Sequence, residues 1–192
     1  MQLLATSELE SAIPADVASL AGDFEALVRL YRPQVFRFAL ASLRDTDAAE
    51  TVTQDCFLRA YQARHRFRQD CSLRTWLIQI AVNLIRDRMR SRRLQFWRRA
   101  SLRCLPVDVV RSTIADGARS PETQALLQQQ VAAIWNAAEC LPQKQRTVFL
   151  LRFVEDMDLL EIAAATGMKE GTVKSHLSRA LRAVRERIGE LT

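Results

Sequence analysis

The sequence predicts an all-α fold made of two small helical domains joined by a flexible linker. Apolar residues make up 48% of the 192-residue chain, which is ample for a core in each domain. Only 5 Gly and 5 Pro are present, so the chain holds little of the turn chemistry that an all-β fold requires. Apolar side chains also recur every three or four residues in several segments, which is the spacing of one helix face.

The chain begins with an acidic, weakly patterned arm at residues 1–21, which we expect to be loosely ordered. Helical patterning starts at Asp23, and Pro33 is a candidate site for a kink in this first helix. Its apolar stripe comprises Phe24, Leu27, Tyr31 and Phe38. Residues 45–47 then supply cap and turn residues. A second amphipathic helix is expected from Ala48 to Ala63, with the inward side chains Val52, Cys56 and Tyr61.

An Arg-rich loop and a long helix with two different faces follow. Residues 64–70 are polar around a single Phe67, which predicts a loop. The apolar face of the next helix comprises Leu73, Trp76, Leu77, Ile80 and Leu84. Beside it, at steps of three, four and three, stand Asn83, Arg86, Arg90 and Arg93. This helix is therefore expected to present one stripe to the core and an arginine stripe to an anionic partner.

Residues 101–120 form the predicted linker, because helical periodicity fades there among Pro and Gly punctuation. Ser120 and Pro121 then give a strong helix start. This helix should run to about Glu139, with the inward positions Leu127, Val131, Ile134 and Ala138. Another begins at Pro142, with the later apolar positions Val148, Leu151 and Val154. The expected domains are therefore 22–100 and 121–192.

The most specific local signal is a helix-turn-helix between Leu159 and Leu177. Two steeply crossing helices need a small residue where their backbones meet, a turn residue free to take positive φ, and a branched apolar residue as a seal. Ala163, Gly167 and Val173 fill these three roles in order. Asp158 can cap the first helix, and Gly171-Thr172 opens the second. The inward stripe of the second helix comprises Val173, Leu177, Ala180, Val184 and Ile188.

Positive charge gathers in two separate blocks. The net charge of +6 divides into +10 over residues 64–103 and +3 over residues 171–192, while residues 1–63 carry −4 and residues 104–170 carry −3. Neutralisation of phosphates by Arg and Lys supplies most of the sequence-independent affinity for nucleic acids, so two blocks predict two contacts with a polyanion. Charge alone leaves open that both blocks are solvated helix faces.

Several classes of protein are disfavoured. The first 28 residues contain no Lys or Arg, and polar residues interrupt the most apolar windows, so we expect neither a secretory segment nor a membrane span and assign a cytoplasmic location. The cysteines, which are Cys56, Cys71, Cys104 and Cys140, lack zinc-site spacing and are expected to be reduced and mostly packed. A nuclease is disfavoured because no HxE motif, paired-carboxylate site or nucleophile elbow is present, so the chain is expected to be no enzyme.

Two blocks of this sequence are similar, in order, to the extracytoplasmic-function sigma factors, which are group 4 of the sigma-70 superfamily. In region two, Ala49-Glu50 followed by Gln54-Asp55-Cys56-Phe57-Leu58-Arg59-Ala60-Tyr61 resembles the pattern Asp-Ala-Glu-x-x-x-Gln-Glu-x-Phe-x-Arg-Ala-Tyr. Residues 67–77 and 80–83 resemble the loop and helix that melt and read the minus-ten element. Residues 141–146 and the helix-turn-helix resemble region four, which reads the minus-thirty-five element.

The resemblance implies a role for each matched residue. The surface that docks on the β′ clamp coiled coil is matched by Gln54, Asp55, Phe57, Arg59 and Tyr61. The minus-ten positions are matched by Phe67, Arg68, Asp70, Arg74, Trp76, Asn83, Arg86 and Arg90. The minus-thirty-five positions are matched by Thr172, Lys174, Ser175, Ser178, Arg179 and Arg182. Core packing is the alternative for Phe57, Tyr61 and Trp76. Departures at Thr51, Gln69 and Cys71 put the loop geometry and the promoter preference in question.

The implied function is that of an alternative, stress-responsive sigma factor without cofactor or small-molecule substrate. Its implied partners are core RNA polymerase, through the β′ clamp coiled coil and the β flap, promoter DNA, and an inhibitory anti-sigma factor that is often membrane-anchored. The competing hypothesis is a dimeric helix-turn-helix regulator with a sensory N-terminal half. The Arg-rich first domain argues against the small-molecule pocket that such a half would need.

Overall fold

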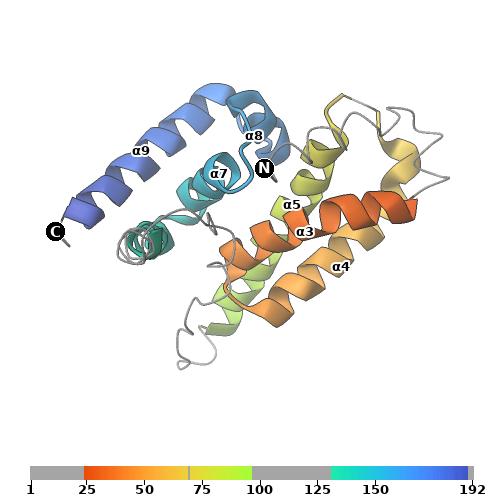
Figure 1. Ribbon diagram of the computed structural model, residues 1–192, viewed down its shortest axis with the longest axis horizontal. Helices are drawn as coiled ribbons and strands as arrows, with labels where there is room; N and C mark the ends of the chain where they lie inside the picture. Colours follow the sequence, from red (N-terminus) through yellow and green to blue (C-terminus); the bar gives the residue numbers. More distant parts are fainter. Residues whose placement is uncertain (1–23, 69, 97–130, 190–192) are drawn as a thin grey trace, which may run out of the picture.

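The computed structural model describes residues 24–68, 70–96 and 131–189, and in these ranges all regular structure is helical (Figure 1). The helices are α3 (Phe24–Leu43), α4 (Thr46–Ala63), the 3-10 turn η1 (Arg64–Arg66), α5 (Leu73–Phe96), α7 (Gln143–Phe153), α8 (Leu159–Thr166) and α9 (Glu170–Gly189). Residues 131–139 are helical as well. The all-α prediction is confirmed. The expected arm at 1–21, the linker at 101–120 and the helix start at Ser120-Pro121 lie outside the described residues.

Helices α3, α4 and α5 form the N-terminal bundle. Asp45 caps α4, because its side chain accepts a hydrogen bond of 2.9 Å from the backbone N–H of Ala48. Val52 and Cys56 face the core as expected. The inward assignment of Tyr61 is wrong, since this side chain is 48% exposed. It lies in the last turn of α4, where it meets the edge of Phe24 with ring centroids 5.2 Å apart.

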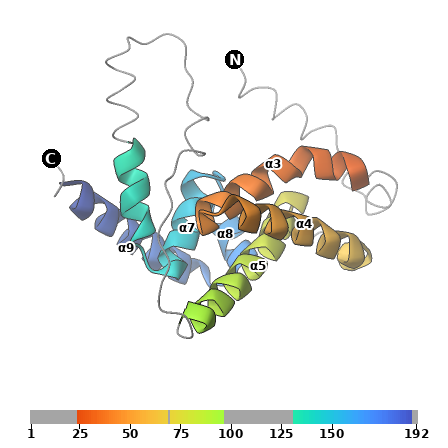
Figure 2. The same ribbon diagram turned by 90° about the horizontal axis from the view of Figure 1, so that it is seen from below.

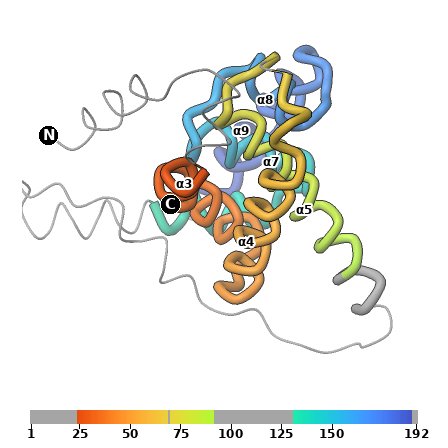
Figure 3. The backbone as a smooth tube through the Cα atoms, turned by 90° about the vertical axis from the view of Figure 1, so that its right-hand side faces the viewer, coloured from red at the N-terminus to blue at the C-terminus, as the bar shows by residue number. Residues whose placement is uncertain are grey.

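The long helix α5 is buried more widely than its predicted apolar stripe. Leu77 and Leu84 are buried as expected, and Leu73, Trp76 and Ile80 pack against the core. Four further apolar residues are also buried, namely Ile78, Ala81, Val82 and Ile85. These additional residues are buried because α5 packs against α8 as well as against α3 and α4 (Figure 3).

The C-terminal bundle consists of residues 131–139, α7, α8 and α9. The inward assignment of Ile134 is wrong, since it is 38% exposed, while Ala137 and Ala138 are buried. Both alanines belong to the buried core cluster. Leu127, the other early apolar position, lies outside the described residues.

The helix-turn-helix has the expected geometry. Asp158 and Glu161 form a capping box at the start of α8, each side chain accepting from the backbone N–H of the other residue at 2.8 Å. Gly167 ends α8 with φ of 70°, which is the left-handed conformation that glycine adopts without steric cost. Val173 is fully buried and seals α9 onto α8.

The two bundles pack against each other, chiefly through α5 with α8 and α3 with α7 (Figure 2). Their buried side chains form one continuous cluster. The sequence contains no signal for this arrangement, because the pairing of two separate helical units depends on surfaces distant along the chain.

The cysteines differ in their surroundings: Cys56 is buried, Cys71 is half-buried and Cys140 is exposed. The Cys56 thiol donates to the carbonyl of Leu77 at 3.4 Å, and burial raises its pKa from the ordinary 9.0 to about 12. Cys71 packs against the core as well, so the expectation that most thiols are packed holds for two of the three described cysteines.

At pH 8 we expect iodoacetamide to alkylate Cys140 in the native protein but to reach Cys56 only after denaturation, because the Cys56 thiol is both enclosed and protonated. Since its pKa is raised, its contribution to stability is present below pH 9 and is lost as the pH rises toward about 12. Peptide mass spectrometry after timed alkylation measures the labelling. Equal labelling of the two cysteines in folded protein would contradict this assignment.

Replacing the turn glycine should destabilise the helix-turn-helix. Gly167→Ala forces a side chain into the left-handed region and should cost about 1 kcal/mol of unfolding free energy. Gly171→Ala is the matched control, because this glycine lies in α9 with open space around its Cα. The control should leave stability unchanged or raise it by up to about 1 kcal/mol. Urea denaturation followed by circular dichroism compares the two variants.

Candidate nucleic-acid interface

The outer face of α9 carries all six residues predicted to contact the minus-thirty-five element, and each is exposed: Thr172, Lys174, Ser175, Ser178, Arg179 and Arg182. Their common face results from the inward stripe of α9, in which Val173, Ala180 and Val184 are buried. Lys174 forms an ion pair of 2.7 Å with Glu170 one turn earlier. Such an exposed pair is weak, so Lys174 can exchange it for a phosphate or a base.

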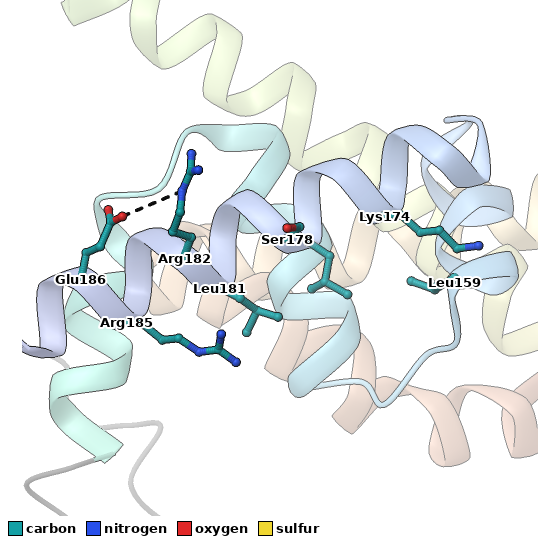
Figure 4. Close-up of a pocket in the computed structure, with 8 residues that line it drawn as sticks. Leu159, Lys174, Ser178, Leu181, Arg182, Arg185 and Glu186 are labelled. Carbon is teal, nitrogen blue, oxygen red and sulfur yellow. Dashed lines mark ion pairs between the residues drawn. The ribbon is translucent and has the colours of Figure 1, made fainter.

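A groove of about 500 Å³ runs along this face between α9 and the start of α8 (Figure 4). Leu159, Leu177 and Leu181 contribute its apolar side chains. Its polar rim comprises Lys174, Ser178, Arg182, Arg185 and Glu186. Three predicted contact residues are therefore brought together, and Arg185 joins them as a cation that sequence reasoning did not select. The signal for Arg185 was its spacing, three residues after Arg182 on the same helix.

His176 lies between this face and the body of the bundle. Its Nδ1 atom is buried and has no hydrogen-bond partner within the described ranges. Burial, together with the charges of Arg179 and Lys144, lowers its pKa. The imidazole is therefore neutral at pH 7 and adds no charge to this face of α9.

The second cationic face lies on α5. Arg86 and Arg90 are exposed, and Arg86 donates a hydrogen bond of 2.7 Å to the Oδ1 atom of Asn83, which is half-buried. The two residues thus form one polar unit at the surface. Of the predicted stripe, the side chain of Arg93 lies outside the described residues.

The aromatic residues of the predicted minus-ten site lie in the loop before α5 and in the first turn of that helix. Phe67 is buried, and its ring packs on Trp76 with centroids 5.0 Å apart and planes tilted by 41°. Arg68 and Asp70 are exposed beside them. The cluster places an aromatic pair among polar edges, which is the composition of a site that stacks an unpaired base. Phe67 itself is covered in this arrangement, so stacking on its face requires a local shift.

Arg74 points away from this cluster, toward the C-terminal bundle. Its Nη2 atom donates to the backbone carbonyl of Glu155 and lies 3.8 Å from Oε2 of the same residue. The structure therefore separates Arg74 from the other predicted minus-ten residues. The sequence analysis did not select Glu155, because nothing in the sequence distinguishes a turn acid that becomes buried from one that stays in solvent.

The surface predicted to dock on the polymerase lies on α4. Gln54, Arg59 and Tyr61 are exposed, Asp55 is half-buried, and Phe57 is buried at 7% exposure. The sequence left two interpretations of these aromatic residues, core packing and contact with the polymerase. Phe57 packs in the core, whereas Tyr61 faces outward. Arg64 stacks its guanidinium over the Tyr61 ring, 3.9 Å from the centroid.

Leu58 adds an apolar side chain to this surface, with 55% of it exposed. Sequence reasoning did not select it. Phe57 and Leu58 are adjacent apolar residues, and the sequence does not show which of them is exposed. The orientation of α4 about its own axis decides that.

Among the described residues, no three His, Cys, Asp or Glu side chains lie close enough together to hold a metal ion. No helix in the described ranges is long and apolar enough to cross a bilayer.

Comparison with protein families matches both halves of the chain. Residues 27–95 match the family described as Sigma-70 region 2, and residues 132–184 match Sigma-70, region 4. The first match contains α4 and most of α5, and the second contains the helix-turn-helix.

Relatives are similar over nearly the whole chain. The ECF RNA polymerase sigma factor SigM of Mycobacterium tuberculosis is 30% identical over 166 residues, covering 85% of this chain and 77% of that protein. SigW of Bacillus subtilis, also an ECF RNA polymerase sigma factor, is 28% identical over 169 residues, or 88% of this chain and 90% of that protein. The Probable RNA polymerase sigma factor RfaY of Xanthomonas campestris is 31% identical over 180 residues, but the chain spans only 44% of its length.

Solved structures share the fold. The sigma factor RpoE of Bartonella quintana, in complex with the anti-sigma factor NepR, has a TM-score of 0.67 at 24% identity, covering 87% of this chain and 97% of that one. CnrH in complex with the cytosolic domain of CnrY has a TM-score of 0.61 at 20% identity, covering 98% and 97%.

Proposed function

Because the chain belongs to the extracytoplasmic-function sigma factors of the sigma-70 family, we propose that it binds core RNA polymerase and directs promoter-specific initiation of transcription. The observation that carries this proposal is the pairing of two exposed cationic helix faces, on α5 and α9, in one chain. The family consists of initiation factors rather than enzymes, so the polymerase supplies the chemistry. This chain would supply duplex recognition and strand opening.

The proposed division of labour follows the two expected domains, 22–100 and 121–192. The first would dock on the β′ clamp coiled coil through Gln54, Arg59 and Tyr61, with Leu58 as an apolar contact, because these side chains are exposed on one helix. It would also hold the minus-ten element through Asn83, Arg86 and Arg90. The second would read the minus-thirty-five element with α9 and contact the β flap.

An anti-sigma factor is the proposed regulator. The solved sigma factor RpoE was captured with the anti-sigma factor NepR, and its fold matches this chain along most of its length. We assign this protein the same class of partner, which would block the polymerase-binding and DNA-binding surfaces until a stress signal releases it.

A dimeric helix-turn-helix regulator is not favoured. Such a protein needs a sensory N-terminal half, whereas residues 27–95 match sigma region 2. A run-off assay separates the two functions, because a classical regulator cannot make core polymerase initiate. Purified chain and core enzyme, with fragmented genomic DNA as template, should yield discrete transcripts. Core enzyme alone is the control, and absence of transcripts from every template would refute the proposal.

Arg179→Ala should weaken binding at the minus-thirty-five element by about 1–3 kcal/mol if the side chain reads a base. The reason is that an exposed guanidinium on a recognition helix bonds two acceptors of one base edge. Arg187→Ala, in the last turn of the same helix, is the matched control. Fluorescence anisotropy with matched and mutated duplexes measures the loss. A loss of equal size on every duplex would make Arg179 a phosphate contact instead.

Asn83→Ala should impair strand opening more than duplex binding, because its polar unit with Arg86 offers hydrogen bonds to an unpaired base. Permanganate footprinting of unpaired thymines, combined with gel shifts of the closed complex, separates the two steps. Asn136→Ala is the control, since this exposed asparagine lies in the other bundle. Identical footprints for the Asn83 variant and the parent would contradict the role.

A further inference from the structure

Three side chains stack at the end of α4, beside the start of α3 (Figure 1). The guanidinium of Arg64 lies over the ring of Tyr61, 3.9 Å from its centroid. From α3, the ring of Phe24 meets Tyr61 with centroids 5.2 Å apart and planes inclined by 71°. Tyr61 stays 48% exposed although both neighbours contact its ring. The stack therefore lies at the surface of the N-terminal bundle.

The position of Arg64 is fixed by two hydrogen bonds to one carbonyl group. Its Nη1 atom donates to the backbone carbonyl of Tyr61 at 2.6 Å, and its backbone N–H donates to the same carbonyl. The side chain that covers the ring is thus tied to the residue that bears the ring. A guanidinium that is already held in place loses little conformational entropy when a ligand stacks on it. Its planar group also suits the flat face of a nucleic-acid base.

The positive charge around this stack is not neutralised by acidic side chains. Arg66 and Arg68 are exposed, and no residue of η1 is buried. Within the described ranges, neither of them nor Arg64 forms an ion pair with a carboxylate. Unpaired arginines attract phosphates, and aromatic side chains among them stack bases. Together these groups have the composition of a surface for single-stranded nucleic acid.

The stack also adjoins the predicted minus-ten loop along the chain. The backbone N–H of Phe67 donates to the carbonyl of Arg64 at 3.4 Å, so the single turn of η1 joins the end of α4 to this loop. Gln54 and Leu58, which belong to the proposed polymerase-docking surface, lie earlier on α4. Tyr61 and Arg64 therefore stand between the docking surface and the loop that is expected to open the promoter.

A single strand fits this combination better than a protein surface or a duplex does. A protein partner would have to supply a carboxylate for each unpaired arginine, whereas every nucleotide carries a phosphate and a flat base together. In duplex DNA the bases are stacked on one another and present only their edges in the grooves. The expected ligand is therefore a strand whose bases are unpaired.

We propose that Tyr61 and Arg64 form a stacking platform for one unpaired base of the displaced promoter strand, and that Arg66 binds a phosphate next to it. This inference rests on the proposed function, since an opened promoter supplies such a strand. Every base has an aromatic face, so the stacking platform accepts any base and adds affinity without sequence preference. It thereby differs from the cluster of Phe67 and Trp76, which is assigned to reading the minus-ten element.

The test removes the planar group and keeps the charge. Arg64→Lys retains a cation but loses the flat guanidinium. On a promoter fork that carries the displaced strand as a single-stranded tail, holoenzyme with this variant should bind about tenfold more weakly than parental holoenzyme. On the fully paired promoter the two should bind alike. Arg187→Lys is the matched control, because it makes the same exchange at an exposed position of the other bundle. The control should bind both templates like the parent.

A scan with abasic nucleotides then locates the base. Each nucleotide of the tail is replaced in turn, and binding of parental and Arg64→Lys holoenzyme is compared at each position. Removal of the stacked base should weaken the parent about tenfold and the variant hardly at all, because both changes remove the same contact. Exchange of that base for any other base should leave parental binding within about twofold.

Each outcome separates the inference from the function. Equal affinity of parent and Arg64→Lys for the fork would overturn the stacking platform, and so would losses that add independently at every abasic position. Equal losses on fork and paired promoter, together with weaker binding of core polymerase, would assign Arg64 to docking instead. All of these results leave the sigma function intact if the parent supports transcription. Failure of the parent to transcribe from any template would remove the function itself, whatever the fork binding shows.

Discussion

The helix α5 packs against α3 and α4 with one side and against α8 with another, while its exposed arginines remain in solvent. A helix with two buried sides needs more apolar positions than one stripe supplies, and α5 has them in Ile78, Ala81 and Val82 beside Leu77. The third side is then free for polar residues. The whole arrangement depends on this division, because α5 both completes the N-terminal core and carries the C-terminal bundle.

Local patterns predicted the helices well. The turn at Gly167 and the seal at Val173 are each decided by neighbours within a few residues, and each stands where the sequence placed it. The cap of α4 falls within the expected residues 45–47, at Asp45, so the helix starts two residues earlier than Ala48. Burial at helix ends was harder to predict. Tyr61 and Ile134 satisfy the helical period yet are exposed, since the period fixes a face and the neighbouring element decides how far along the helix that face is covered.

The candidate site divides in the same way. The six residues on α9 share a face because one amphipathic helix dictates it, so sequence alone could select them. Arg74 belongs to an equally plausible pattern but contacts Glu155, 81 residues away along the chain. No local rule pairs two such positions. Contacts between domains depend on the shapes of whole bundles, and the sequence carries that information only through the complete fold.

The exposed arginines affect the rate at which the protein finds a site on DNA as well as its affinity for DNA. A protein whose Arg86, Arg90 and Arg179 all face solvent retains a sequence-independent attraction to any stretch of duplex. These exposed charges therefore allow the protein to slide and hop along duplex DNA. The search for a promoter depends on this charge, whereas the start of transcription depends on contact with both promoter elements.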